Sequence, residues 1–82
     1  MNRDWVLFHL REARKQLEQT INEIETDESY SYGDYQVDMS HAYHHLNTAW
    51  NSQDATDQEA KESNDGNFER WRQFPIHIDL SA

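Results

Sequence analysis

The sequence predicts an all-α fold built on an antiparallel hairpin of two helices. Apolar residues recur at helical spacing in residues 4–26 and again in residues 35–51, and a segment rich in turn formers, residues 27–34, separates these two stretches. A connection of this length is typical of two neighbouring helices that run in opposite directions. Because the chain has 82 residues, we expect one small helical domain over residues 1–82.

The first helix is expected over residues 4–26, a stretch without glycine or proline. Its apolar positions recur every three or four residues and fall within about 40° of Leu17 on a helical wheel. They are Val6, Leu10, Ala13, Leu17, Ile21 and Ile24. A narrow stripe of this kind is typical of a helix that packs against one partner helix. Trp5 and Phe8 point away from this stripe, so the start of the helix needs a further cover.

The second helix is expected over residues 35–51, with Asp34 as its N-cap. One face of this helix collects its apolar side chains. They are Tyr35, Met39, Ala42, Tyr43, Leu46, Ala49 and Trp50. We expect this face to meet the stripe of the first helix.

A polar linker, residues 52–66, follows the second helix. Within it, Thr56 and Glu59 have the spacing of a capping box, which predicts a short surface turn. Residues 67–82 should form a short helix that Pro75 ends, followed by an extended tail. In this tail Ile76, Ile78 and Leu80 alternate with polar residues, a pattern typical of an extended segment with one buried face. The tail would cover the start of the first helix, either in its own hairpin or in a second chain.

The composition predicts a small hydrophobic core. Only 14 of the 82 residues are Leu, Ile, Val or Phe, and the net charge is -9. These values alone favour disorder, but three Trp and four Tyr favour a folded chain. Chains of this size bury only ~60% of the surface that they expose when unfolded. We therefore expect a homodimer in which two hairpins form a four-helix bundle.

Charge and cysteine content exclude several classes of function. The chain has no cysteine, which excludes disulfides and thiol chemistry and favours a reducing cytoplasm. The longest apolar run covers residues 5–8, far short of a membrane helix, and no signal peptide is expected. Residues 16–69 contain one base, Lys61, and thirteen acids, a balance that opposes nucleic-acid binding. We therefore expect a protein partner and neither nucleic acid nor membrane.

The best candidate site lies in the histidine cluster of the second helix, where His41 and His45 share one flank and His44 points to the back of the helix. His41 and His45 are four residues apart, a spacing that lets two imidazoles on one helix share a metal ion, and Asp38 lies on the same flank. Ordinary surface pairing produces the same pattern. The His-Ala-Tyr-His sequence also lacks the glutamate of a metalloprotease motif.

The register of the two helices decides whether a metal site would be complete. If Leu17 lay near residue 44, Glu23 would lie near Asp38 and His41, and Gln16 near His45. Two imidazoles and one or two carboxylates would then converge, a donor set suited to a divalent transition metal.

No motif for catalysis or for cofactor binding is present. No serine lies in a Gly-x-Ser-x-Gly elbow, and Gly33 and Gly66 are too far apart to form a phosphate-binding loop. We therefore expect no enzymatic activity and no cofactor, and assign no catalytic, cofactor-binding or metal-ligating residue. The sequence predicts a non-enzymatic protein-protein interaction module that acts through the hairpin or the tail. The alternative function is a metal-binding helical bundle that uses His41 and His45.

Overall fold

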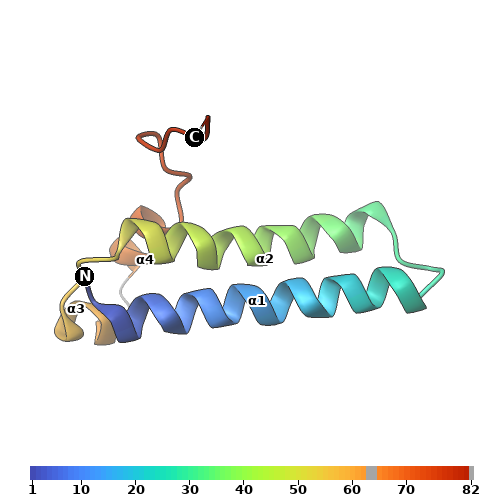
Figure 1. Ribbon diagram of the computed structural model, residues 1–82, viewed down its shortest axis with the longest axis horizontal. Coiled ribbons are helices and arrows are strands. Elements are labelled where there is room, and N and C mark those ends of the chain that lie inside the picture. Colours follow the sequence, from blue (N-terminus) through green and yellow to red (C-terminus); the bar gives the residue numbers. More distant parts are fainter. Residues whose placement is uncertain (63–64, 82) are drawn as a thin grey trace.

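The computed structural model describes residues 1–62 and 65–81, and these residues form two long and two short helices. The long helices lie side by side and run in opposite directions, and the short ones lie at the end of the pair that holds the N-terminus (Figure 1). The helices are α1 (Arg3–Thr26), α2 (Tyr32–Asn51), α3 (Asp57–Lys61) and α4 (Asp65–Trp71). The described residues contain no β-strand. The prediction of an all-α chain with two long packed helices is therefore confirmed.

The start of α1 is fixed to the segment that follows α2. The Asn2 side chain accepts a hydrogen bond from the Trp5 backbone N–H at 3.2 Å and donates one to the Ala55 carbonyl at 3.0 Å. The Asn2 backbone N–H donates to the Gln53 carbonyl at 2.6 Å. The Asn2 side chain caps α1 because it satisfies an otherwise unpaired N–H group of the first turn. The same side chain joins the start of α1 to the segment after α2.

The start of α2 differs from the sequence prediction. The helix begins at Tyr32 rather than at about residue 35, and its N-cap is Ser31 rather than Asp34. Asp34 is instead the second partner of a capping box, since its carboxylate accepts a hydrogen bond from the Ser31 backbone N–H at 3.0 Å. The same motif starts α3, where Thr56 and Glu59 form the box that their spacing indicates.

The side chains that α1 buries against α2 overlap the predicted apolar stripe only at Ala13. Helix α1 buries His9, Ala13, Gln16 and Thr20. The mean direction of these positions lies about 70° around the helix from Leu17, at the centre of the predicted stripe. Four of the six predicted stripe residues, Leu10, Leu17, Ile21 and Ile24, are 38–55% exposed. The expectation that the apolar stripes of the two helices face each other therefore holds only at Ala13, Ala42 and Ala49, and the large apolar side chains of both stripes lie at the edge of the contact or outside it.

The face of α2 that contacts α1 also buries small and polar side chains. Its buried positions include Ala42, His45 and Ala49, spaced by three and four residues. Spacings of three and four residues keep one face of a helix against a single partner helix. The contact is made by small and polar side chains because hydrogen bonds between the helices, described below, lie on this face.

The C-terminal tail does not cover the hairpin as expected. Ile76 and Leu80 are 85% and 89% exposed, and of the three alternating residues only Ile78 is half-buried. The end of the chain rises away from the helices (Figure 1), although Ile78 lines a hollow with Val6 and Leu10 of α1. The cover comes instead from α4, whose Trp71 is buried and packs against Trp5 with ring centroids 6.0 Å apart.

Two asparagines of α2 hold the end of α4. The Asn51 side chain donates to the Trp71 carbonyl at 2.8 Å, and the Asn47 side chain donates to the Arg72 carbonyl at 3.0 Å. The last carbonyls of a helix have no partner within that helix. Side chains of α2 therefore satisfy the end of α4 and place Trp71 over Trp5.

We predict that Ser31→Ala destabilises the chain by about 1 kcal/mol, because it removes the N-cap hydrogen bond of α2. Urea unfolding followed by circular dichroism measures this change. Ser40→Ala is the control, since Ser40 is exposed inside the same helix and bonds only the preceding turn. Equal unfolding midpoints for the two variants would contradict the assigned cap.

Candidate functional site

Three imidazoles form a hydrogen-bonded row between the long helices. His9 Nδ1 of α1 lies 3.0 Å from His45 Nδ1 of α2, and His45 Nε2 lies 3.2 Å from His41 Nε2. The row ends at Gln16 of α1, whose Oε1 lies 2.6 Å from His41 Nδ1. We call these four residues the imidazole chain. It crosses from α1 to α2 and back again, so it joins the two helices at two places.

The direction of the hydrogen bonds follows from the Gln16 end. The Thr20 hydroxyl donates to the Gln16 carbonyl at 2.9 Å, so its oxygen accepts from Gln16 Nε2 at 3.1 Å. This contact orients the Gln16 amide and leaves its oxygen facing His41. An amide oxygen only accepts. His41 Nδ1 must therefore carry a proton.

The remaining tautomers follow in sequence, since a neutral imidazole has one donor and one acceptor nitrogen. His41 Nε2 accepts, so His45 Nε2 donates to it and His45 Nδ1 accepts in turn. His9 Nδ1 then donates to His45 Nδ1. The lone pair at the end of the imidazole chain is therefore on His9 Nε2.

His9 Nε2 is buried and has no hydrogen-bond partner among the described residues. Thr48 Oγ1 and His44 Nδ1 share this condition. All three residues line one cavity of about 140 Å³ between α1, α2 and α4. We call it the aromatic cavity because Trp5, Phe68 and Trp71 form much of its wall. The side chains of His9 and Thr48 are more than nine-tenths buried there.

Burial favours the neutral forms of His9 and His45. Loss of hydration is the main cause that lowers the pKa of His9 from its ordinary value of 6.5 to about 4, and His45 and His44 lower it further. Burial also lowers the pKa of His45, together with His44 and His41 and against the opposing effect of Glu12. Neutral imidazoles are what the hydrogen-bond directions of the imidazole chain require.

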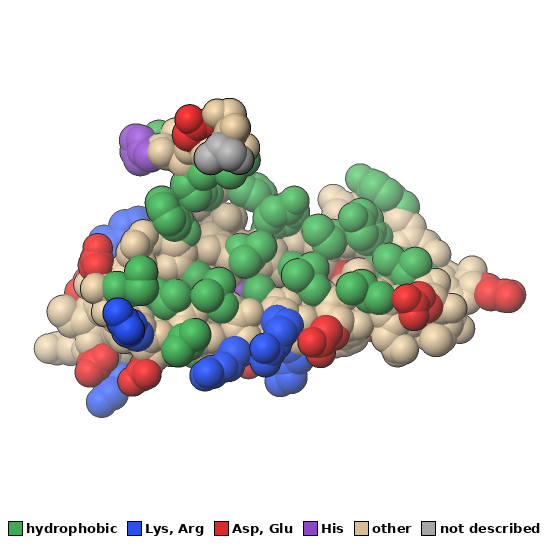
Figure 2. Space-filling model, in the orientation of Figure 1, with side chains coloured by type: hydrophobic (Ala, Val, Ile, Leu, Met, Phe, Trp, Pro, Cys, Tyr) green, Lys and Arg blue, Asp and Glu red, His purple; other side chains and the backbone are tan. Residues whose placement is uncertain are grey.

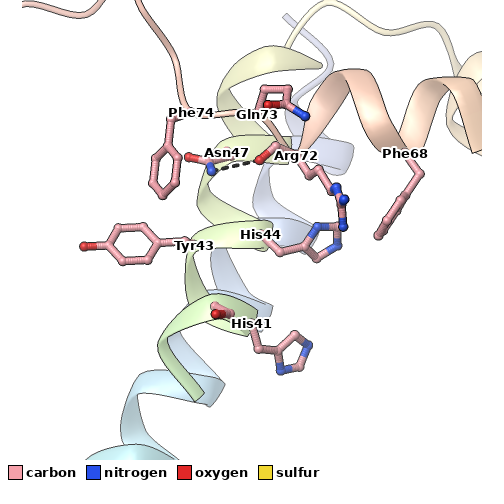
Figure 3. A pocket seen from close by; sticks show the side chains of 9 residues that line it. His41, Tyr43, His44, Asn47, Phe68, Arg72, Gln73 and Phe74 are labelled. Atoms are coloured by element: carbon pink, nitrogen blue, oxygen red, sulfur yellow. Dashed lines mark hydrogen bonds between the residues drawn. The ribbon is translucent and has the colours of Figure 1, made fainter. Parts of the chain in front are cut away.

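A second hollow lies on the other side of His44 and is open to solvent. This groove of about 610 Å³ runs between α2 and the segment after α4. His44 lies beside Arg72 and Phe68 within it, one turn along α2 from His41 (Figure 3). Burial is also the main cause that lowers the pKa of His44, and His41 and Arg72 add to this effect. The Arg72 side chain forms an ion pair with Glu69 at 3.1 Å, so its charge is already partnered.

The candidate metal ligands do not converge as the sequence analysis proposed. His41 and His45 lie together, but their Nε2 atoms bond each other. Asp38 accepts a hydrogen bond from the Tyr30 hydroxyl at 2.8 Å, and Glu23 accepts one from Gln19 at 2.9 Å. In the part of the chain that the structure describes, no three His, Asp or Glu side chains are arranged to hold a metal ion.

The register explains this difference. Gln16 lies opposite His41 and His9 lies opposite His45, so the helices are offset by roughly one to two turns from the alignment that would place Leu17 near residue 44. The metal hypothesis did not include His9, which lies against His45. Its spacing with Ala13, Gln16 and Thr20 was the available signal. Those residues are mostly polar, and hydrophobic periodicity does not detect a polar face.

Comparisons of the chain with profiles of known protein families, with curated proteins and with solved structures find no match. The function must therefore be argued from the geometry of this chain. Among the helices of the described residues, none is both long and apolar enough to cross a membrane.

We predict that acid destabilises the fold before its carboxylates are protonated. The folded pKa of His9 is lowered, so the unfolded chain binds more protons between pH 6.5 and about 4 and the free energy of unfolding falls as the pH falls through this range. The loss that His9 causes should reach ~2 kcal/mol near the lower limit, with allowance for partial hydration. Urea unfolding at a series of pH values measures it.

His9→Phe should flatten this pH dependence, whereas His77→Phe should leave it unchanged because His77 lies exposed in the tail. The prediction fails if His9→Phe and the unmodified chain lose stability equally between neutral pH and about 4.

Proposed function

We propose that the chain is a protein-protein interaction module that associates with a second copy of itself through one face of the hairpin. The observation that carries this proposal is the contrast between the buried and the exposed apolar side chains. The buried hydrophobic residues of the described chain are only Ala13, Ala42, Ala49 and Trp71. Most of its large aliphatic and aromatic side chains are at least partly exposed, so a single chain buries little apolar area.

The exposed side chains gather on one face. Leu10, Leu46 and Trp50 line the same hollow where α1 and α2 meet. Helical periodicity places the other exposed apolar residues of both helices on the same side. We call it the apolar face. It comprises Leu10, Leu17, Ile21 and Ile24 of α1 and Tyr35, Tyr43, Leu46 and Trp50 of α2, each 38–55% exposed. Hydrophobic side chains form a continuous band over both long helices in Figure 2. Contiguous apolar surface of this kind marks interaction sites.

The dimensions of the apolar face suit a second hairpin. At 1.5 Å per residue the 24 residues of α1 span about 36 Å, and two adjacent helices are about 20 Å wide, which gives roughly 700 Å². A stable interface buries about 800 Å² of each partner. A second copy has a face of the same length and width. Two hairpins packed in this way would form a four-helix bundle.

The charges beside the apolar face favour an antiparallel arrangement of the two copies. The outer flank of α1, about 60–120° from Leu17 and away from α2, carries Arg11 and Arg14 followed by Glu18 and Glu25. All four side chains are exposed, and none forms an ion pair with a described residue. If α1 of one copy lies antiparallel on α1 of the other, the two arginines meet the two glutamates twice. Such complementarity selects orientation.

We predict that Ile21→Asp converts the dimer into a folded monomer, because it places a charge in the centre of the apolar face. Light scattering after size-exclusion chromatography should show half the mass. Val37→Asp is the matched control, since Val37 is 69% exposed and lies on the side of α2 opposite Leu46. An unmodified chain that remains monomeric at high micromolar concentration would refute the proposal.

A second pair of variants tests the orientation of the dimer. Arg11→Glu with Arg14→Glu makes the flank wholly acidic, and Glu18→Arg with Glu25→Arg makes it wholly basic. Each double variant should dimerise at least tenfold more weakly than the unmodified chain, because like charges repel across the interface. An equal mixture of the two should restore the dimer. Two variants that each self-associate like the unmodified chain would disprove the antiparallel arrangement.

A further inference from the structure

We propose that the aromatic cavity binds a small, neutral, aromatic molecule that carries a hydroxyl or N–H hydrogen-bond donor, of the phenol class. This inference does not depend on the apolar face or on the proposed dimer. It rests on three features of one place: the size of the cavity, its aromatic walls and the unpartnered polar atoms that line it.

The size and the walls fit a single six-membered ring. The volume is about 140 Å³, and apolar cavities of about 150 Å³ accept benzene. Trp5 and Trp71 pack edge to face with centroids 6.0 Å apart, and Phe68 lies 5.0 Å from His44. The Trp5 indole N–H is already bonded to Ser52 Oγ at 2.7 Å, so Trp5 offers the cavity its ring. Aromatic rings favour an aromatic guest in offset or edge-to-face contact.

The imidazole chain sets the polarity of the site. His9 Nδ1 is used as a donor to His45, so His9 Nε2 can only accept. His9 is 6% exposed and Thr48 is 4% exposed, and neither His9 Nε2 nor Thr48 Oγ1 has a partner in the described chain. An unpaired buried polar atom costs about 1–3 kcal/mol. A guest with a donor group removes this cost, which a hydrocarbon of the same shape cannot do.

The charges around the cavity favour a neutral guest. No carboxylate is among the described side chains that line it, so a buried cation would lack a counter-charge. An anion is equally disfavoured, because burial keeps His9 in its uncharged form. The guanidinium groups of Arg70 and Arg72 already lie over the rings of Trp71 and Phe68, 5.5 Å and 5.2 Å from the centroids, and their charges oppose a further cation.

Phenol and toluene are the probes that test this proposal on the unmodified chain, because they differ only in the donor group. We expect phenol to bind at least tenfold more tightly than toluene, measured by titration of the Trp5 and Trp71 fluorescence and by saturation-transfer NMR. A site that hydrogen-bonds a hydroxyl discriminates against the analogue that lacks it. In ¹H–¹⁵N NMR spectra, phenol should shift the unprotonated nitrogen of His9 and toluene should not.

Ala60→Leu provides the blocking variant, since Ala60 lines the cavity on α3, outside the two helices that carry the imidazole chain. It should abolish phenol binding while circular dichroism shows an unchanged fold. Gln58→Leu is the matched control, because Gln58 is exposed on the same helix and should leave binding intact. The proposal is overturned if phenol binds no more tightly than toluene, or if neither binds at millimolar concentration and the cavity holds only water.

Discussion

The hydrogen-bonded row from Gln16 to His9 is the constraint on which the rest of the structure depends. Its two bonds between the helices form only when Gln16 lies opposite His41 and His9 lies opposite His45. Each bond also needs a proton on one particular nitrogen. Buried polar groups are costly when unpaired and contribute about 1 kcal/mol for each bond when paired. Sliding the helices by one turn would leave several imidazole and amide groups buried without partners. The polar contact therefore specifies the register more strictly than interlocking apolar side chains would.

Two consequences follow from this constraint. The first is that most large apolar side chains of both helices turn outward, because the face between the helices is occupied by small and polar side chains. The hairpin then has one exposed apolar face and little apolar interior, which is the basis of the proposed self-association. The second is that the chain of tautomers ends in a lone pair at the wall of a cavity. One buried network thus accounts for both the proposed interface and the proposed ligand site.

The sequence alone supports part of the fold. The absence of glycine and proline from residues 4–26 and the spacing of Thr56 and Glu59 are local features, and the structure has α1 and the α3 capping box at these places. The missed cap at Ser31 was also local, since Asp34 lies three residues after it as a capping box requires. The position of the C-terminal tail differed from the prediction for a non-local reason. Alternation in Ile76, Ile78 and Leu80 indicates that one face could be buried, but it does not supply a surface to bury it, and Trp71 already covers Trp5.

The amino-acid sequence by itself determined the two long helical segments, because helix formation and capping depend on residues within a few positions of one another. It also placed His41 and His45 one turn apart on one face of α2. Only the tertiary structure decided which face of each helix turns inward and that His9 joins those two histidines. That choice depends on satisfying donors and acceptors from both helices together, and periodicity within one helix carries no information about the other.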